Sequence, residues 1–397
     1  MELERNLNFD EPVERKNTDS LKYDFAVRRG KPAGVLPLWV ADMDFRTSSF
    51  ILDAVEERVK HGIFGYTETR DDYFDALFGW MKDHHGLELR PEWVLKTPGV
   101  VFALAMAVKA YTEAGDHILI QQPVYYPLTE VVQDNGRQVV SSDLVLGQDG
   151  KYRIDFEDFE RKVQEYGIKL FMLCNPHNPV GRVWTKEELS RIADICIRNN
   201  VIIVSDEIHE DFTYPGHKHV PLLTVDERLK DRVITCTSPS KTFNLAGLQT
   251  ANIFIPDQKL RRKFRKQIQA AGYSQLNTLG VVACKAAYTK GEVWHKAVCE
   301  YIHANLGFLK DYLRENFPEV KVIEPEGTYL VWLDFRGLGL CDREIEDLIV
   351  NKAGLWLDGG GIFGKSGEGF QRINLATTRA TLKEALDRLV KIRPEIQ

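Results

Sequence analysis

Short apolar runs recur along the middle of the chain, between about residues 95 and 255, with amphipathic segments between them. Near-continuous apolar runs are typical of strands buried on both faces. Their alternation with amphipathic segments is typical of a largely parallel sheet covered by helices. The pattern therefore predicts an α/β fold whose strands include the runs ILIQQ (118–122), LFMLC (170–174), VIIVS (201–205), VITCT (233–237) and ANIFI (251–255).

One crossover helix is marked clearly between the second and third runs. Thr185 followed by Glu188 has the spacing of a capping box, in which each side chain accepts from a backbone N–H at the helix start. Apolar residues then recur at helical spacing, at Leu189, Ile192, Ala193, Cys196 and Ile197. The segment predicts a strand–helix–strand unit.

The last hundred residues have a different pattern. A helical pattern over about 292–315 precedes two strand candidates, TYLVWLDF (328–335) and FQRINLA (370–376), and a final helix is expected after Thr381. This order predicts a smaller α+β domain at the C-terminal end.

These patterns divide the chain into three parts. Residues 1–47 carry several prolines and little periodicity, and we expect them to form an arm that contributes to the small domain. Residues 48–290 are expected to form the large, ligand-binding domain with its mostly parallel sheet, and residues 291–397 the small domain.

Length and charge limit the classes of function. A chain of 397 residues with 44% apolar residues is long enough for two packed domains. The 52 basic and 58 acidic residues give a formal net charge of -6. Without a basic surplus, neither nucleic acid nor an anionic membrane is expected as a partner, and a small-molecule ligand is favoured.

The cysteines and apolar stretches bear on location. Six cysteines are scattered singly, which argues against a zinc site and against a disulfide framework, so we expect no metal and a reducing cytoplasm. The charged N-terminus lacks the apolar core of a signal peptide. The longest apolar stretch, near residues 100–108, is far shorter than the roughly 20 residues that span a bilayer.

Polar segments follow three of the predicted strands. They are NPHNPVG (175–181), DEIH (206–209) and SPSKTFN (238–244). Open α/β folds bind their ligands at the carboxyl ends of the strands, so we expect Asn178, Asp206 and Lys241 to meet there. A lysine that can join an aldehyde, with a carboxylate that can keep a ring nitrogen protonated, describes a pyridoxal phosphate site.

At these residues the chain resembles the fold-type I pyridoxal-phosphate enzymes, the aminotransferase-like superfamily of class I and II. Within them it resembles the carbon–sulfur β-lyases of the cystathionine β-lyase (MalY/PatB) type. The motifs that carry the resemblance are LPLWVADMDF (36–45), HGIFGYT (61–67), NPHNPVGRVW (175–184), SDEIHEDF (205–212), SPSKTFNLAG (238–247) and EGTYLVWLDFR (326–336). They extend over nearly the whole chain and occur in the family's order.

The resemblance implies roles for the residues at the cofactor ring. Lys241 matches the lysine that binds the cofactor covalently and later moves protons, and Asp206 matches the carboxylate that pairs with the pyridine nitrogen. Asn178 matches the amide that hydrogen-bonds the phenolic oxygen, and Tyr125 matches the aromatic residue stacked on the ring. His209 stands where many aminotransferases have a tyrosine and is expected to contact the cofactor.

The resemblance also implies groups that bind the phosphate. The backbone N–H groups of Val100 and Val101 begin an apolar helix and can face an anion. Ser238 matches a phosphate-binding hydroxyl. Tyr66 resembles a tyrosine that reaches the phosphate from the partner subunit, which implies a homodimer.

The substrate side is implied in the same way. Arg372 matches the arginine that binds the substrate α-carboxylate in a bidentate pair, with Asn178 and Ala41 beside it. Six of these residues also have a purely structural alternative: a solvated or surface charge for Lys241 and Arg372, a cap or turn residue for Asp206, a turn residue for Asn178, and a buried core aromatic residue for Tyr66 and Tyr125.

The stretch GGGIFGKS (359–366) fits the spacing of a phosphate-binding P-loop. A P-loop requires a helix directly after Lys-Ser, whereas Gly367, Gly369 and a predicted strand with Arg372 follow here. A nucleotide hydrolase is therefore excluded. In the resembling family this loop lines the substrate side, where backbone passes close to the ligand.

The cofactor alone does not choose the reaction. Many aminotransferases have an arginine eight residues after the lysine, where this chain has Gln249, and this departure, with His209 and WVADMDF, favours the lyase branch. The resemblance implies cleavage of cystathionine or a related cysteine S-conjugate to a thiol, pyruvate and ammonia. An aminotransferase of the same fold and a catalytically silent regulatory protein remain alternatives.

Overall fold

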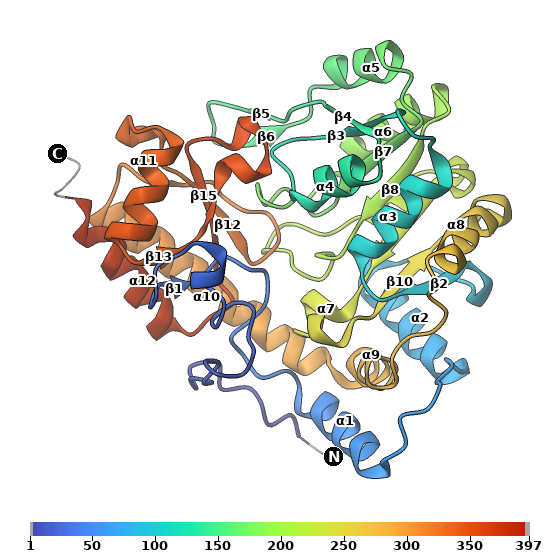
Figure 1. Ribbon diagram of the computed structural model, residues 1–397, viewed down its shortest axis with the longest axis horizontal. Coiled ribbons are helices and arrows are strands. Elements are labelled where there is room, and N and C mark those ends of the chain that lie inside the picture. The colour runs from blue at the N-terminus through green and yellow to red at the C-terminus, as the bar shows by residue number, and fades with distance from the viewer. Residues whose placement is uncertain (1–2, 394–397) are drawn as a thin grey trace.

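A seven-stranded mixed sheet lies at the centre of the computed structural model, which describes residues 3–393 (Figure 1). In sheet order its strands are β2 (Val94–Thr97), β10 (Ala251–Phe254), β9 (Val233–Thr237), β8 (Ile202–Asp206), β7 (Leu170–Cys174), β3 (His117–Ile120) and β4 (Gln138–Ser141). The strands from β9 to β4 are parallel, and β10 is antiparallel to both of its neighbours. The predicted α/β fold is confirmed, although the sequence pattern did not predict β2 and β4.

Helices cover both faces of this sheet, and its strands point apolar side chains toward the helices on both faces. In β3, Ile118 and Ile120 belong to one apolar cluster, while Leu119 belongs to the other. The first cluster includes α3 (Val100–Tyr111), α4 (Pro127–Asp134) and α8 (Gln258–Ala270). The second includes α1 (Ser49–His61), α2 (Asp71–His85), α5 (Phe156–Glu165), α6 (Lys186–Arg198) and α9 (Thr278–Lys290). Each buried aliphatic or aromatic side chain contributes roughly 1.5–3 kcal/mol.

The crossover helix α6 begins as the sequence predicts. Thr185 accepts a hydrogen bond from the backbone N–H of Glu188, and the Glu188 carboxylate accepts one from the backbone N–H of Thr185. The capping box is therefore confirmed. It fixes where the chain enters the helix after the segment that follows β7.

A smaller antiparallel sheet lies beside the large one, and the long helix α10 runs from this unit toward α9 (Figure 1). Its strands, in sheet order, are β11 (Lys321–Val322), β12 (Leu330–Asp334), β15 (Phe370–Asn374) and β14 (Asp358–Gly359). Its helices are α10 (Glu292–Asn316), α11 (Asp342–Asp347) and α12 (Arg379–Lys391). Helix α12 begins before the predicted Thr381 because Thr378 caps it by accepting from the Thr381 N–H.

The N-terminal segment pairs with the C-terminal part of the chain. Strand β1 (Leu36–Pro37) is parallel to β13 (Leu355–Trp356), and Trp39 stacks on Trp356 with ring centroids 4.4 Å apart. This pairing supports the predicted arm, while the domain limits at residues 47 and 290 stay a prediction. Among residues 3–393, no helix has the length and hydrophobicity needed to cross a membrane.

Short elements complete the connections. A hairpin joins β5 (Val145–Leu146) and β6 (Tyr152–Arg153), and α7 (Pro239–Thr242) follows β9. The short 3-10 turns are Val27–Arg29, Pro91–Trp93, Leu222–Thr224, Glu227–Asp231, Ala246–Leu248, Arg336–Leu338, Gly360–Phe363 and Lys365–Gly367, and Leu348–Lys352 is a π-helical segment directly after α11.

Candidate active site

The carboxyl ends of β7, β8 and β9 meet at one edge of the sheet. These strands are adjacent and parallel, with Cys174 opposite Asp206 and Asp206 opposite Cys236. The segments that follow them therefore converge on a cavity of about 380 Å³. Eight of the predicted site residues line it: Ala41, Val100, Val101, Tyr125, Asn178, Asp206, His209 and Lys241.

Lys241 lies on α7, directly after the third of these strands. Its Nζ donates a hydrogen bond to the carbonyl oxygen of Ala41 at 2.7 Å. Burial, together with the charge of Arg372, lowers the pKa of the Lys241 amine to about 8, although the charges of Asp42 and Asp206 oppose the shift. A larger fraction of this amine is therefore neutral near physiological pH than for an exposed lysine, which favours nucleophilic and proton-transfer chemistry.

Asp206, the last residue of β8, is a buried carboxyl group with few partners. It accepts a hydrogen bond from the backbone N–H of Ile208 at 3.2 Å, and no ion pair involves it in the described part of the chain. Burial raises its pKa to about 7 because the charged form loses solvation, although the Ile208 N–H and the charge of Lys241 oppose the shift. A cationic N–H donor held in the cavity would compensate for that loss.

Arg372 joins the small sheet to the cavity wall. It donates to the Asn178 side-chain oxygen at 3.0 Å and to the Trp39 carbonyl oxygen at 2.7 Å. It also forms a buried ion pair with Asp358, its cross-strand neighbour on β14. The guanidinium thus lies behind Asn178 rather than on the cavity surface. Burial raises the pKa of Asp358 to about 6, although Arg372 opposes that shift.

The start of α3 presents unpaired backbone donors to the other end of the cavity. The first intrahelical bond is from Ala103 to Gly99, so the N–H groups of Val100 and Val101 precede the ladder. A Cβ placed on Gly99 would meet no atom within 4 Å, so the glycine leaves space beside these donors. This end can bind an anion.

Ser238 is placed differently from the other predicted residues. Its buried hydroxyl donates to the Thr250 carbonyl oxygen at 2.6 Å and accepts from the Ser240 N–H at 3.0 Å, as the N-cap of α7. It is not among the residues that line the cavity, whereas Ser240 and Gln249 are. Its role at the phosphate stays a prediction. Sequence analysis missed Ser240 and noted Gln249 only as a departure from the aminotransferase pattern, not as a residue of the site.

Tyr66 and His209 differ in exposure. Tyr66 is fully exposed, on the segment between α1 and α2, and does not line the cavity of its own chain. His209 is buried against the cavity, its Nδ1 has no hydrogen-bond partner, and burial holds its pKa well below the usual value. A neutral imidazole with an unpaired nitrogen is thus available to a bound ligand.

The glycine-rich stretch at 359–366 forms two short 3-10 turns, Gly360–Phe363 and Lys365–Gly367, and strand β15 follows. No helix begins after Lys365-Ser366, and the exclusion of a P-loop is confirmed. The Phe363 ring lies 4.9 Å from the Arg372 guanidinium carbon. The loop therefore packs against the arginine rather than binding a nucleotide phosphate.

Together these groups fit pyridoxal phosphate. The cavity holds an amine for the aldehyde, an uncompensated carboxyl group for the ring nitrogen and a helix start for the phosphate. Tyr125, which lines the same cavity, offers a flat aromatic face.

Comparisons with known proteins agree with this geometry. Residues 33–389 match the model of the family described as aminotransferase class I and II. The chain is 44% identical to cystathionine β-lyase PatB of Bacillus subtilis, over 96% of this chain and 99% of that protein. The crystal structure of cystalysin from Treponema denticola, which contains pyridoxal 5'-phosphate, superposes with a TM-score of 0.95 at 37% identity, covering 98% of this chain and 99% of that one. The pyridoxal-phosphate-bound C–S lyase of Staphylococcus hominis gives a TM-score of 0.89 at 34% identity, covering 97% of each chain.

Proposed function

This chain belongs to the class I and II aminotransferase family, and from that premise we propose that it is a pyridoxal-phosphate-dependent carbon–sulfur β-lyase. Its substrate is cystathionine or a related cysteine S-conjugate, and its products are a thiol, pyruvate and ammonia. The observation that carries the proposal is one cavity in which Lys241 faces the uncompensated carboxyl group of Asp206.

Different residues bind different parts of the cofactor. Lys241 binds its aldehyde, Asp206 keeps the ring nitrogen protonated, and Asn178 donates to the phenolic oxygen. The N–H groups of Val100 and Val101 bind the phosphate. When bound, pyridoxal phosphate supplies an electron sink for the charge left on the substrate after its α-proton is removed.

The chain's own groups then direct the reaction. Arg372 exchanges its hydrogen bond to the Asn178 side chain for the substrate α-carboxylate, which it binds in a bidentate pair, and so fixes the orientation of the α-carbon. Lys241, with a pKa lowered to about 8 by burial, takes the α-proton as the general base. The β-thiolate departs from the substrate, and hydrolysis of the remaining three-carbon fragment gives pyruvate and ammonia.

The products distinguish this proposal from an aminotransferase. The holoenzyme is incubated with cystathionine without any keto acid, and pyruvate and free thiol are measured. We expect continuous release of both in equal amounts. A single half-turnover that leaves the cofactor aminated would instead identify an aminotransferase, and a colourless protein without turnover would identify a regulatory protein.

Replacing Arg372 by Lys tests the carboxylate site. We expect kcat/KM to fall about 10- to 100-fold, mainly through KM, because a charge-assisted hydrogen bond contributes about 1.5–3 kcal/mol. The lysine keeps the positive charge beside Asp358, so the fold is preserved. Arg336→Lys, which changes a half-exposed arginine paired with Asp334, is the control and should leave KM unchanged. An unchanged KM in Arg372→Lys would contradict the assignment.

The exposed surface around Tyr66 supports a homodimer. Ile63, Phe64 and Tyr66 are exposed on one segment, and Val101 is exposed at the start of α3, where the phosphate is expected. An apolar patch of this kind is typical of a protein interface. We propose that the Tyr66 hydroxyl reaches the phosphate of the partner subunit's cofactor.

For Tyr66→Phe we expect about 10- to 100-fold weaker cofactor binding, since one hydrogen bond to a charged group is lost. A hybrid dimer tests whether Tyr66 acts in the site of the partner subunit. Mixing Tyr66→Phe chains with Lys241→Ala chains gives one intact site per hybrid dimer if Tyr66 acts in trans. Recovery of activity on mixing is expected. No recovery, with dimers formed, would place Tyr66 in its own chain's site.

The cysteines support a reducing location. All six are free thiols, and four of them are buried. Burial raises the pKa of the Cys174 thiol, which lines the cavity, well above its usual value, so it is a poor nucleophile. We therefore propose the cytoplasm as the location of the enzyme and give its thiols no part in the reaction.

A further inference from the structure

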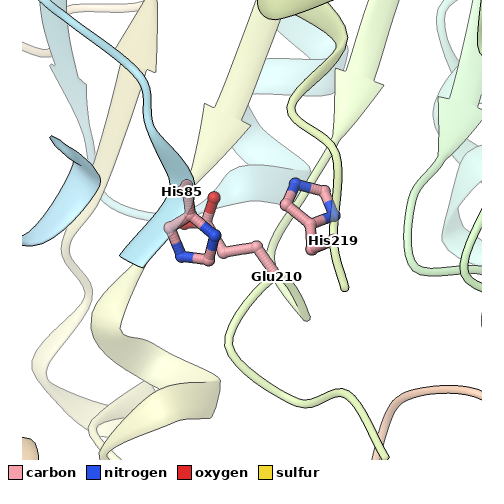
Figure 2. A group of neighbouring side chains, drawn as sticks. All are labelled: His85, Glu210 and His219. Carbon is pink, nitrogen blue, oxygen red and sulfur yellow. The ribbon is translucent and has the colours of Figure 1, made fainter. Parts of the chain in front are cut away.

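Three side chains meet in a second place, away from the cofactor cavity: His85 at the end of α2, and Glu210 and His219 in the segment after β8 (Figure 2). All three are buried, with 8%, 3% and 3% of their surface exposed. One potential ligand atom from each lies within 4.8 Å of the other two. Two imidazoles and one carboxylate are a common ligand set for divalent transition metals.

The hydrogen bonds behind the two histidines orient them for such a role. His85 Nε2 lies 2.8 Å from the Asp211 carboxylate, and His219 Nε2 lies 2.9 Å from the Glu207 carboxylate. Each carboxylate accepts a hydrogen bond from the Nε2–H group, which leaves the lone pair on Nδ1 in the neutral ring. A carboxylate behind a histidine is the arrangement that orients metal-binding imidazoles in proteins.

Two of the potential ligand atoms have no hydrogen-bond partner among residues 3–393. His219 Nδ1 and one oxygen of Glu210, Oε2, are buried without a hydrogen bond. Buried polar atoms are nearly always satisfied, and a bound cation would satisfy both.

The three residues can be reached from solvent. Together with Asp211, His295 and Cys299 they line a cavity of about 380 Å³. Its wall also includes the exposed residues Lys218, Lys296 and Glu300. An ion can therefore enter without unfolding of the surrounding chain.

We propose that His85, Glu210 and His219 bind one divalent transition-metal ion, Zn²⁺ by preference, with a fourth position open to water. Zinc binds nitrogen and oxygen at about 2.0–2.2 Å in a tetrahedron, so the ligand atoms must move about an ångström closer. The cysteine spacing gave no sign of this site because its ligands are histidine and glutamate, far apart in the sequence.

The site is connected to both catalytic segments. Glu207 directly follows Asp206, and Asp211 accepts a hydrogen bond from Thr242, the residue after Lys241, at 2.5 Å. A metal that holds His85 and His219 against these carboxylates therefore stabilises the segments that carry Asp206 and Lys241. We assign it a structural role, and its existence does not depend on which reaction the enzyme catalyses.

Metal binding is measured on the holoenzyme after dialysis against a chelator, by titration with Co²⁺ alone and then Zn²⁺. We expect one Co²⁺ per chain with the strong visible d–d absorption of a tetrahedral or five-coordinate ion, displaced by Zn²⁺. The melting temperature should rise with Zn²⁺ concentration.

Glu210→Gln keeps the size and burial of the side chain and should weaken Co²⁺ binding on the order of 100-fold, with cofactor absorbance unchanged. Glu300→Gln, on the same cavity wall, is the matched control and should bind as the wild type does. Absence of stoichiometric Co²⁺ binding, or equal binding by Glu210→Gln, would overturn the proposal. If that variant does not fold, X-ray absorption spectroscopy of the wild-type Co²⁺ complex tests the site by counting histidine ligands. Two are expected, and fewer than two would exclude this site.

Discussion

Replacing Lys241 by Ala is expected to abolish both the cofactor's visible absorbance and turnover. The variant loses the amine that binds the cofactor and the general base that takes the α-proton. A positioned base alone contributes about 10²–10⁴-fold, so we expect kcat to fall by about 10⁴-fold or more. Absorbance spectra of the reconstituted protein and the pyruvate assay measure the two effects.

The change should not disturb the fold. Lys241 is only partly buried, and its Nζ makes one hydrogen bond, to the Ala41 carbonyl oxygen. Lys383→Ala removes an exposed lysine paired with Asp387 on α12 and serves as the control, with wild-type colour and rate. A Lys241→Ala protein that stays yellow after dialysis and turns over would refute the proposed role.

For Asp206→Asn we expect kcat to fall by about 10²–10³-fold while the protein remains folded. Asparagine has no negative charge to keep the cofactor's ring nitrogen protonated. Removing one preorganised group that stabilises developing charge has an effect of that size. Steady-state kinetics at saturating cofactor measure it, and a wild-type kcat would contradict the pairing.

The same variant should change how stability depends on pH in the cofactor-free protein. Because burial raises the folded-state pKa of Asp206 to about 7, the folded state binds more protons than the unfolded state between about pH 4 and pH 7. Its contribution to stability therefore falls as pH rises through that window. Asp206→Asn has no carboxyl group to ionise at this position, so it does not lose stability in this way. It should melt at a higher temperature than wild type above pH 7, which calorimetry can measure.

Strands with strong patterns could be predicted from the sequence. The runs at 170–174 and 233–237 coincide with β7 and β9 because each is rich in apolar or β-branched residues and is followed by polar, turn-forming residues. The missed strands are half polar: β2 reads VLKT and β4 reads QVVS. Such short segments become strands through pairing with neighbours, and that context is absent from a local pattern.

The candidate site likewise contains residues that the sequence predicts and residues that only the folded structure brings together. Motifs placed Lys241, Asp206 and Asn178 at the ends of adjacent strands, and the structure brings all three to one cavity. Asp358 was missed because it lies opposite Arg372 only through the pairing of β14 with β15. The sequence suggested Ser238 as a site residue instead of Ser240. Ser238 is the N-cap of α7, and its side chain therefore bonds to the helix start, whereas Ser240 lines the cavity. These features follow from tertiary geometry rather than from spacing.

The covalent link between the cofactor and Lys241 is tested most directly by borohydride reduction of the reconstituted holoenzyme, followed by proteolysis and mass spectrometry. The account predicts a single reduced phosphopyridoxyl group, on the peptide that contains Lys241. A protein that carries no such group, or carries it on another lysine, would contradict the account.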